Sequence, residues 1–266
     1  MNPEEEYIQI NRQSWNLRTE SHLKSGFYDL PAFVMGASSL KAIELGLIGN
    51  VRGKSILHLQ CHFGQDSISL SRLGARVHGV DLSDKAIEAA RELNTQCRQN
   101  AEFTCCNLYD LPSHLHNTFD IVFSTYGTIG WLPDIRAWAS VVSHFLKPGG
   151  KFVFVEFHPM VWVFDNDFQK IAYRYFRSEA IVEEEEGSYT DRKADLKTLN
   201  VGWNHGLAEV MGALLDQGLV LGHFGEYDYS PYNCFRHTVE TEPGKFRIAH
   251  LGDKIPMLYS LVFSKP

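Results

Sequence analysis

A short stretch in the first third of the sequence limits the folds that this chain can adopt. Residues 56–59, Ile-Leu-His-Leu, form an apolar run of the length of a buried strand, and a turn over 60–64 follows it. The spacing then predicts a helix over 65–73, which Gly74 can end in a left-handed conformation, and a second apolar strand over 75–80. Strand, turn, helix and strand in this order form the building unit of a doubly wound α/β sheet.

Asp81 directly follows the second strand and indicates a kind of ligand. In such a unit, the backbone N–H groups of the turn and the N-terminus of the helix face the bound molecule. A carboxylate at the end of the second strand can accept the hydroxyl hydrogens of a ribose. The segment therefore predicts an adenosine-containing ligand at the carboxyl edge of the sheet.

Strands and helices continue to alternate beyond Asp81. Ser83 has the side chain and position of an N-cap, and residues 147–150, Lys-Pro-Gly-Gly, are expected to end a later helix. Further strands are predicted over 101–106, 119–124, 151–157, 219–227 and 257–263. Alternation of this kind predicts an α/β fold with a mostly parallel sheet that helices cover on both faces.

Two segments lie outside this pattern. Residues 1–50 are expected to form helices, and they could act as a lid over the ligand or simply pack on the sheet. Residues 158–202 are irregular and rich in aromatic side chains, which is typical of an inserted cap that lines a pocket or covers a sheet edge. The run of glutamates at 183–186 is expected to be a solvated face. Because no linker divides the chain, we expect one domain over 1–266.

The composition narrows the range of partners. With a formal charge of −7, the 266-residue chain has no excess of basic residues to bind a nucleic-acid backbone. Its five cysteines lack metal-ligand spacing, and no apolar run reaches the ~18 residues of a membrane span. The acidic residues 1–10 do not resemble a signal peptide. We therefore expect a cytoplasmic protein, monomeric or homodimeric, without metal, membrane or nucleic-acid partners.

The order of the motifs resembles that of a known family. After Asp81 come Asn107-Leu108, then FDIVFS at 119–124 and LKPGGKFVFVEF at 146–157, one more helix and a closing pair of strands. This order resembles the class I S-adenosylmethionine-dependent methyltransferases, especially the branch that acts on small molecules. The resemblance rests on motifs in the first part of the chain and on topology in the last part.

The resemblance implies a fold, a reaction and a cofactor. The fold is a Rossmann-like sheet of seven mostly parallel strands whose last strand is antiparallel, with N-terminal helices and an inserted cap. The reaction is methyl transfer from S-adenosylmethionine to a small-molecule acceptor by in-line displacement. The product of the cofactor is S-adenosylhomocysteine, and no metal takes part.

The resemblance also implies roles for individual residues. The turn over 60–64 would face the methionine part and the ribose, Asp81 would bind the ribose hydroxyls, and Leu82 would pack on the adenine. Asn107 and Leu108 would meet the adenine as well. The implied cofactor-binding residues are Gln60, Cys61, His62, Gly64, Asp81, Leu82, Asn107, Leu108, Ser124 and Thr125.

The turn departs from the family's pattern of an acid followed by three alternate glycines. His58 replaces the acid, Gln60 and His62 replace the first two glycines, and Gly64 alone remains. Asn107 also stands where an aspartate is common. Glycines serve in such turns because they permit positive φ angles and close backbone approach. Gln60 and His62 must therefore adopt allowed angles or make side-chain contacts of their own.

The chemistry predicts which residues act on the acceptor. The methyl group of a sulfonium is already activated, so the protein mainly holds the reacting atoms in line, and a general base helps if the acceptor carries a proton. Ligands of open α/β sheets bind at the carboxyl edge, where Tyr126 follows one strand and Glu156 and His158 follow another. These three are the catalytic candidates; His158 could instead cap backbone groups.

Other interpretations remain open from the sequence. The altered turn would suit a non-catalytic protein that binds an adenosine ligand as a sensor or regulator. A nicotinamide-dependent oxidoreductase fits less well, because its fingerprint needs three glycines. His58 is expected to be a hydrogen-bonded core residue, and His114 and His116 lack a third metal ligand, so a solvated loop is expected there.

Overall fold

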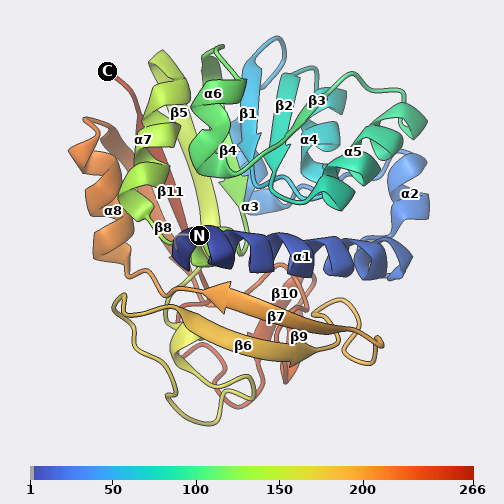
Figure 1. The fold of residues 1–266 in the computed structure, drawn as a ribbon, viewed down its shortest axis with the longest axis vertical. Helices are drawn as coiled ribbons and strands as arrows, with labels where there is room; N and C mark the ends of the chain where they lie inside the picture. Colours follow the sequence, from blue (N-terminus) through green and yellow to red (C-terminus); the bar gives the residue numbers. More distant parts are fainter. Residues whose placement is uncertain (1–2) are drawn as a thin grey trace.

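A computed structural model describes residues 3–266, and seven of its strands form one central sheet (Figure 1). The order across the sheet is β3-β2-β1-β4-β5-β11-β8. Only β11 runs against its neighbours β5 and β8, so the predicted mostly parallel sheet with an antiparallel last strand is confirmed. The strands are β1 Ser55–Leu59, β2 Arg76–Asp81, β3 Glu102–Cys105, β4 Phe119–Thr125, β5 Leu146–Phe157, β8 Val220–Tyr227 and β11 Leu258–Ser264.

Helices cover both faces of the sheet, as the apolar strands require. One face packs against α3, α4 and α5, and the other against α6, α7 and α8 (Figure 1). Strand β5 shows why, because from Phe152 to Val155 each side chain is fully buried whichever face it points to. The helices are α1 Pro3–Lys24, α2 Leu30–Val34, α3 Ala42–Ile48, α4 Gln65–Arg72, α5 Asp84–Gln96, α6 Leu111–His114, α7 Ile135–Phe145 and α8 Leu207–Asp216.

Local sequence signals set most of the helix ends. The Ser83 hydroxyl accepts a hydrogen bond from Ala86 N at the start of α5, and Gly74 after α4 has φ +93°. The expected break at 147–150 is only partly correct. Helix α7 ends at Phe145, but strand β5 begins at once with Leu146, which pairs with Phe119, so these residues belong to the strand instead of a turn.

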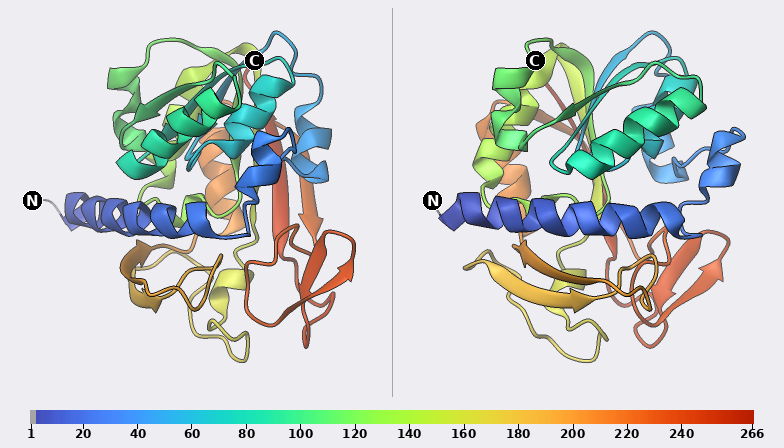
Figure 2. Two further views of the ribbon diagram at one scale, coloured as in Figure 1. Left: turned by 90° about the vertical axis from the view of Figure 1, so that its right-hand side faces the viewer. Right: turned by 45° about the vertical axis from the view of Figure 1, so that its right-hand side comes forward.

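Helix α1 crosses the carboxyl edge of the sheet, between the sheet and a hairpin (Figures 1 and 2). The hairpin consists of β6 Ile181–Glu186 and β7 Lys197–Gly202, inside the segment that the sequence predicted to be irregular. The Asn11 side chain donates to Val201 O and accepts from Val201 N, which fixes α1 to β7. A second hairpin, β9 Thr238–Glu242 and β10 Lys245–Ile248, lies in the C-terminal part.

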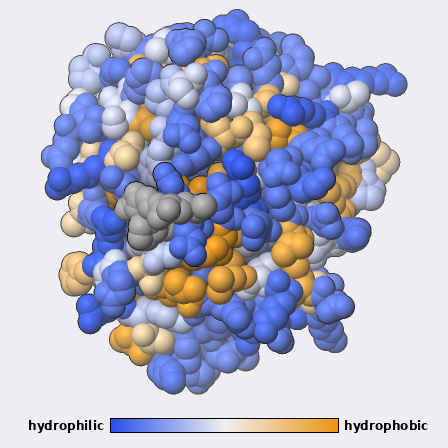
Figure 3. Space-filling view, in the orientation of Figure 1, coloured by the Kyte–Doolittle hydropathy of each residue, from blue (hydrophilic) through white to orange (hydrophobic). Residues whose placement is uncertain are grey.

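The expectation that residues 183–186 form only a solvated face is wrong for Glu185. Its carboxylate pairs with Arg18 of α1, whose side chain is 3% exposed, and with Asn200. Apolar surface nevertheless covers part of the hairpin region below α1, where Val182 and Leu199 are exposed (Figure 3). No helix within residues 3–266 is long and apolar enough to cross a membrane.

Candidate functional site

The turn after β1 adopts the backbone conformation that glycines would adopt. Gln60 has φ +54° and His62 has φ +50°, both in the left-handed region, and Gly64 has φ +78°. For residues other than glycine this conformation costs roughly 1–2 kcal/mol each. Gly64 is the one of these three positions where a side chain would force a rearrangement, because a Cβ there would lie 2.8 Å from the Phe103 ring. The departures from the glycine pattern therefore leave the turn's path intact.

Asp81 at the end of β2 is tied to this turn. Its Oδ2 accepts a hydrogen bond from His62 N at 2.8 Å, and its Oδ1 accepts one from Ser83 N at 2.9 Å. Burial raises the pKa of Asp81 to about 6, against the lowering effect of these backbone donors. Each carboxylate oxygen has a second acceptor site, so the group can hold the turn and still bind hydroxyl groups.

The two side chains that replace glycines make defined contacts. Gln60 Nε2 donates to Thr128 O at 2.8 Å, and His62 Nε2 lies 2.9 Å from His22 Nδ1 of α1. His22 Nε2 in turn lies 2.6 Å from Ser188 Oγ of the inserted segment. Desolvation lowers the pKa of His62 to about 3 and that of His22 to about 2, so both rings are neutral at pH 7.

Aromatic side chains from the N-terminal segment lie over the turn. The ring centroid of Trp15 is 5.2 Å from that of His62 and 5.2 Å from that of Trp131, which belongs to the loop after β4. The Tyr28 ring lies 5.8 Å from His62, and its hydroxyl contacts the hydroxyl of Tyr189 in the inserted segment. Residues from 1–50 and 158–202 thus meet above the same turn.

The residues expected near the adenine follow β2 and β3. The Asn107 side chain accepts from Tyr109 N and caps a short 3-10 helix, Leu108–Asp110. Leu108 is buried, and Leu82 O accepts from Arg12 Nε of α1. The Cys106 N–H donates to Asp81 O, which places Asn107 next to the end of β2.

The residues expected near the sulfonium end β4 and begin the loop after it. The Ser124 hydroxyl lies 3.1 Å from the Thr128 hydroxyl, and Thr125 Oγ1 donates to Asp66 Oδ2. Cys61 in the turn is buried. All ten implied cofactor residues therefore lie at or next to the carboxyl ends of β1 to β4, which are neighbours in the sheet.

Glu156 holds the loop after β4 through its carboxylate. Its Oε2 accepts from the N–H groups of Thr128 and Ile129, and its Oε1 accepts from Gly127 N and Phe157 N. The residue is 1% exposed, and burial raises its pKa while these four donors lower it. Both oxygens are committed to backbone groups, so the geometry gives Glu156 a positioning role.

His158 lies after β5 as expected, with its ring directed toward β8. Its Nε2 is 3.0 Å from Glu226 Oε1, its Nδ1 accepts from Met160 N, and its ring packs against Tyr259 of β11. Strands β11 and β8 lie on the side of β5 away from β4 and β1. The ring therefore faces away from the turn that carries His62.

Tyr126 begins the loop after β4 and reaches into the N-terminal segment. It has φ +52°, and its hydroxyl donates to Glu44 Oε2 at 2.6 Å. Glu44 is fully buried in α3, and burial together with the nearby charge of Asp66 raises its pKa to about 7. No motif in the sequence marks Glu44 or His22, because each gains its partner from a distant part of the chain.

Glu44→Gln should change how the free energy of unfolding depends on pH. Burial raises the pKa of Glu44 from 4.5 to about 7, so the unfolded chain loses this proton first as the pH rises. The carboxyl group therefore makes the folded protein less stable as the pH increases from about 4.5 to about 7. Glutamine has nearly the same size and does not titrate. In urea unfolding, the free energy of unfolding of the variant minus that of wild type should rise by about 2 kcal/mol from pH 5 to pH 8.

A matched control isolates this effect. Glu92 is exposed on α5, so the stability difference between Glu92→Gln and wild type should stay constant over the same pH range. A constant difference for Glu44→Gln as well would show that Glu44 ionises normally in the folded protein.

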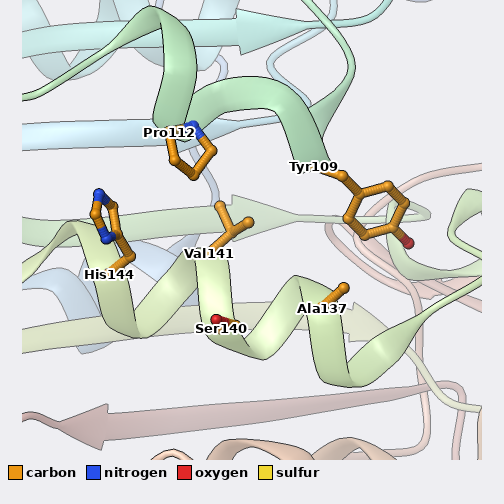
Figure 4. Close-up of a pocket in the computed structure, with 6 residues that line it drawn as sticks. All are labelled: Tyr109, Pro112, Ala137, Ser140, Val141 and His144. Atoms are coloured by element: carbon orange, nitrogen blue, oxygen red, sulfur yellow. The ribbon is translucent and has the colours of Figure 1, made fainter.

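Two surface cavities are lined by other residues than those of the turn. One, of about 230 Å³, lies between α6 and α7 and is lined by Tyr109, Pro112, Ala137, Ser140, Val141 and His144 (Figure 4). The other, of about 470 Å³, is lined by Asp167, Arg192, Asn233, Phe235, Arg236, His237 and Thr238. Neither includes a residue of the turn. Within residues 3–266, no three His, Cys, Asp or Glu side chains are grouped as metal ligands.

The chain is similar to known proteins in sequence and in fold. Residues 56–150 match the family model described as a methyltransferase domain. The ubiquinone biosynthesis O-methyltransferase of Idiomarina loihiensis is 28% identical over 138 residues, which cover 50% of this chain and 56% of that protein. The match thus spans little more than half the length of this curated relative.

Solved structures extend the similarity in fold to most of the chain. A methyltransferase from Mesorhizobium loti superposes with a TM-score of 0.58 at 21% identity, covering 87% of this chain and all of that one. The complex of DhpI with SAH gives a TM-score of 0.56 at 20% identity and covers 98% of each chain. Residues 56–150 are therefore similar to a methyltransferase domain, and the chain shares its fold with S-adenosylmethionine-dependent methyltransferases over most of its length.

Proposed function

We propose that this protein transfers a methyl group from S-adenosylmethionine to a small-molecule acceptor. The observation that carries the proposal is the link between Asp81 and the turn after β1. The carboxylate holds the N–H of His62 while the backbone at 60, 62 and 64 keeps positive φ angles. A ribose and the methionine part attached to it require a turn of this shape beside an acid.

The residues present fit this cofactor. Gln60 Oε1 and His62 Nδ1 are buried in the turn without a hydrogen-bond partner, as expected of groups that bind a ligand. In the proposal, Asp81 binds the ribose hydroxyls, Leu82, Asn107 and Leu108 surround the adenine, and Ser124 and Thr125 lie near the sulfonium. When bound, the cofactor supplies an activated methyl group.

The chain's own residues then orient the reactants and exclude water. The aromatic side chains of α1 and of the segment after it close the site above the turn. Glu156 fixes the loop from Gly127 to Ile129, which brings Tyr126 and Trp131 to defined positions. Holding nucleophile, methyl group and sulfur in line can contribute several kcal/mol to the rate enhancement.

The role of His158 as a general base stays a prediction. It requires the ring to release either Met160 N–H or the carboxylate of Glu226, since both nitrogens face these groups. If the prediction holds, His158→Ala lowers turnover about tenfold or more, the scale of general-base catalysis, without changing the Kd for S-adenosylhomocysteine. Undiminished turnover would remove His158 from the catalytic residues.

The acceptor in this proposal is small and partly apolar. Phe157, Trp162 and Phe235 form a cluster of ring contacts beyond the end of β5, and such surfaces favour apolar or aromatic acceptors. A test is the formation of S-adenosylhomocysteine from S-adenosylmethionine with panels of small phenols, amines and carboxylic acids. The proposal predicts turnover with at least one class, and that Asp81→Ala reduces it.

A non-catalytic adenosine-binding regulator is the second candidate. Gln60 and His62 in place of glycines favour it, because they change the surface that meets the ligand. Tight binding of the cofactor without turnover across all three panels would support this candidate over the enzyme. The expected monomer or homodimer stays a prediction that light scattering tests.

A further inference from the structure

The turn after β1 contains two unpaired polar atoms. Within residues 3–266, five buried side-chain nitrogen or oxygen atoms lack a hydrogen-bond partner, and Gln60 Oε1 and His62 Nδ1 are two of them. A buried polar atom without a partner is costly, so native proteins rarely keep one unless it serves a ligand or a reaction. The two atoms belong to one turn, so a single group bound beside this turn can serve both.

The free atom of Gln60 is a hydrogen-bond acceptor. Its Nε2 donates to Thr128 O at 2.8 Å. The reverse orientation of the amide would set an oxygen against the Thr128 carbonyl oxygen, which has no hydrogen to donate. The remaining atom, Oε1, therefore accepts hydrogen bonds from whatever binds beside it.

The free atom of His62 is also an acceptor. Both His62 and His22 are neutral, so each ring carries one hydrogen. In one arrangement, His62 Nε2–H donates to His22 Nδ1 and His22 Nε2–H donates to Ser188 Oγ, which leaves a lone pair on His62 Nδ1. The opposite arrangement leaves a buried N–H without an acceptor. Proteins tolerate an unpaired acceptor better than an unpaired N–H.

A ligand group with at least two N–H bonds can donate to both acceptors of this turn. The positive charge of an ammonium group strengthens such hydrogen bonds. Two neutral side chains can receive this group without a proton transfer. Burial and the nearby charge of Arg18 keep His62 unprotonated, so its Nδ1 stays available at neutral pH.

We propose that Gln60 Oε1 and His62 Nδ1 accept hydrogen bonds from the α-ammonium group of S-adenosylmethionine. The inference rests on the proposed function, because it assumes this cofactor in the turn. His22 and Ser188 are positioning residues that fix the hydrogen of His62 on Nε2. Since His22 belongs to α1 and Ser188 to the inserted segment, recognition of the amino-acid end depends on both segments packing over the turn.

Calorimetric titration of the full chain tests this inference with three probes. S-adenosylhomocysteine has the ammonium and carboxylate groups, its decarboxylated form has only the ammonium group, and 5′-methylthioadenosine has neither. Gln60→Gly and His62→Gly remove one acceptor each, and glycine keeps the positive φ without strain. In each variant, the Kd for the first two probes should rise by about tenfold or more, which is the scale of a hydrogen bond to a charged group. The Kd for the third probe should stay within about twofold of the wild-type value.

Controls separate this effect from a general change in the turn. Arg98→Gly introduces a glycine at a residue that is exposed but also has a positive φ, +53°, and should leave all three affinities unchanged. Should a glycine variant fail to fold, Gln60→Asn or His62→Asn takes its place, because asparagine tolerates this conformation and its shorter side chain withdraws the acceptor.

The outcomes distinguish the inference from the proposed function. An equal loss of affinity for all three probes would overturn the inference, because the side chains would then only shape the turn. Weakening of S-adenosylhomocysteine alone would overturn it too, since the carboxylate would be the group recognised. A wild-type protein that binds none of the probes would refute the proposed function, and the inference with it.

Discussion

Asp81→Ala should raise the Kd for S-adenosylhomocysteine by about tenfold to a hundredfold while the protein stays folded. The substitution removes a charged acceptor for the ribose hydroxyls, and a hydrogen bond to a charged group contributes about 1.5–3 kcal/mol. It also removes the acceptor of His62 N and Ser83 N, so the turn and the start of α5 lose their common anchor. Calorimetry and circular dichroism measure the two properties separately.

The ionisation of Asp81 adds a pH dependence to this prediction. Because burial raises its pKa to about 6, the carboxylate becomes protonated as the pH falls through about 6. A protonated carboxyl group is a weaker acceptor for two hydroxyl groups, so the affinity of the wild type should fall over this range. Asp84→Ala, an exposed neighbour in the first turn of α5, should keep wild-type affinity. A folded Asp81→Ala protein with an unchanged Kd would refute the assigned role.

Glu156→Ala should lower the free energy of unfolding by about 4 kcal/mol or more. The substitution leaves four backbone N–H groups and the Thr128 hydroxyl without their acceptor. Glu156 is only 1% exposed, so these donors surround a buried carboxylate. Each unpaired buried group costs about 1–3 kcal/mol, and this substitution leaves several donor groups unpaired. Such a loss is a large part of the ~5–15 kcal/mol stability of a typical protein.

Two variants sharpen the test of Glu156. Glutamine keeps the size but offers only one acceptor oxygen, and its amide group faces donors, so Glu156→Gln should lose an intermediate amount. Glu92→Gln on the exposed face of α5 should stay within about 0.5 kcal/mol of wild type in the same urea titrations. A loss below about 1 kcal/mol for Glu156→Ala would mean that water replaces the carboxylate, and that the loop after β4 does not depend on it.

Local sequence patterns were sufficient to predict the centre of the sheet, because its central strands β1, β4 and β5 are mostly buried on both faces. The apolar runs that contain β1, β4 and β5 carry that information within five to twelve residues. The cap of α5 at Ser83 and the stop at Gly74 are equally local. The antiparallel placement of β11 came from the resemblance in motif order, and its pairing with β5 and β8 confirms it.

The contacts above the turn could not be predicted in the same way, because they join distant segments. Strand β6 contains four consecutive glutamates, a pattern that predicts a solvated face. In the fold, however, Arg18 of α1 forms an ion pair with Glu185. Likewise, Glu44 meets Tyr126 only through the tertiary fold. For Gln60 and His62 the sequence left a choice between unusual backbone angles and side-chain contacts, and the structure shows both.

Calorimetric titration of the wild-type protein shows which adenosine-containing compound the turn after β1 and Asp81 bind. S-adenosylmethionine, S-adenosylhomocysteine and NAD are titrated separately into the full chain at neutral pH. We expect saturable binding of the two sulfur compounds with one site per chain, and no binding of NAD. Binding of NAD alone, or of none of the three, would contradict the assignment of this turn and Asp81 to S-adenosylmethionine.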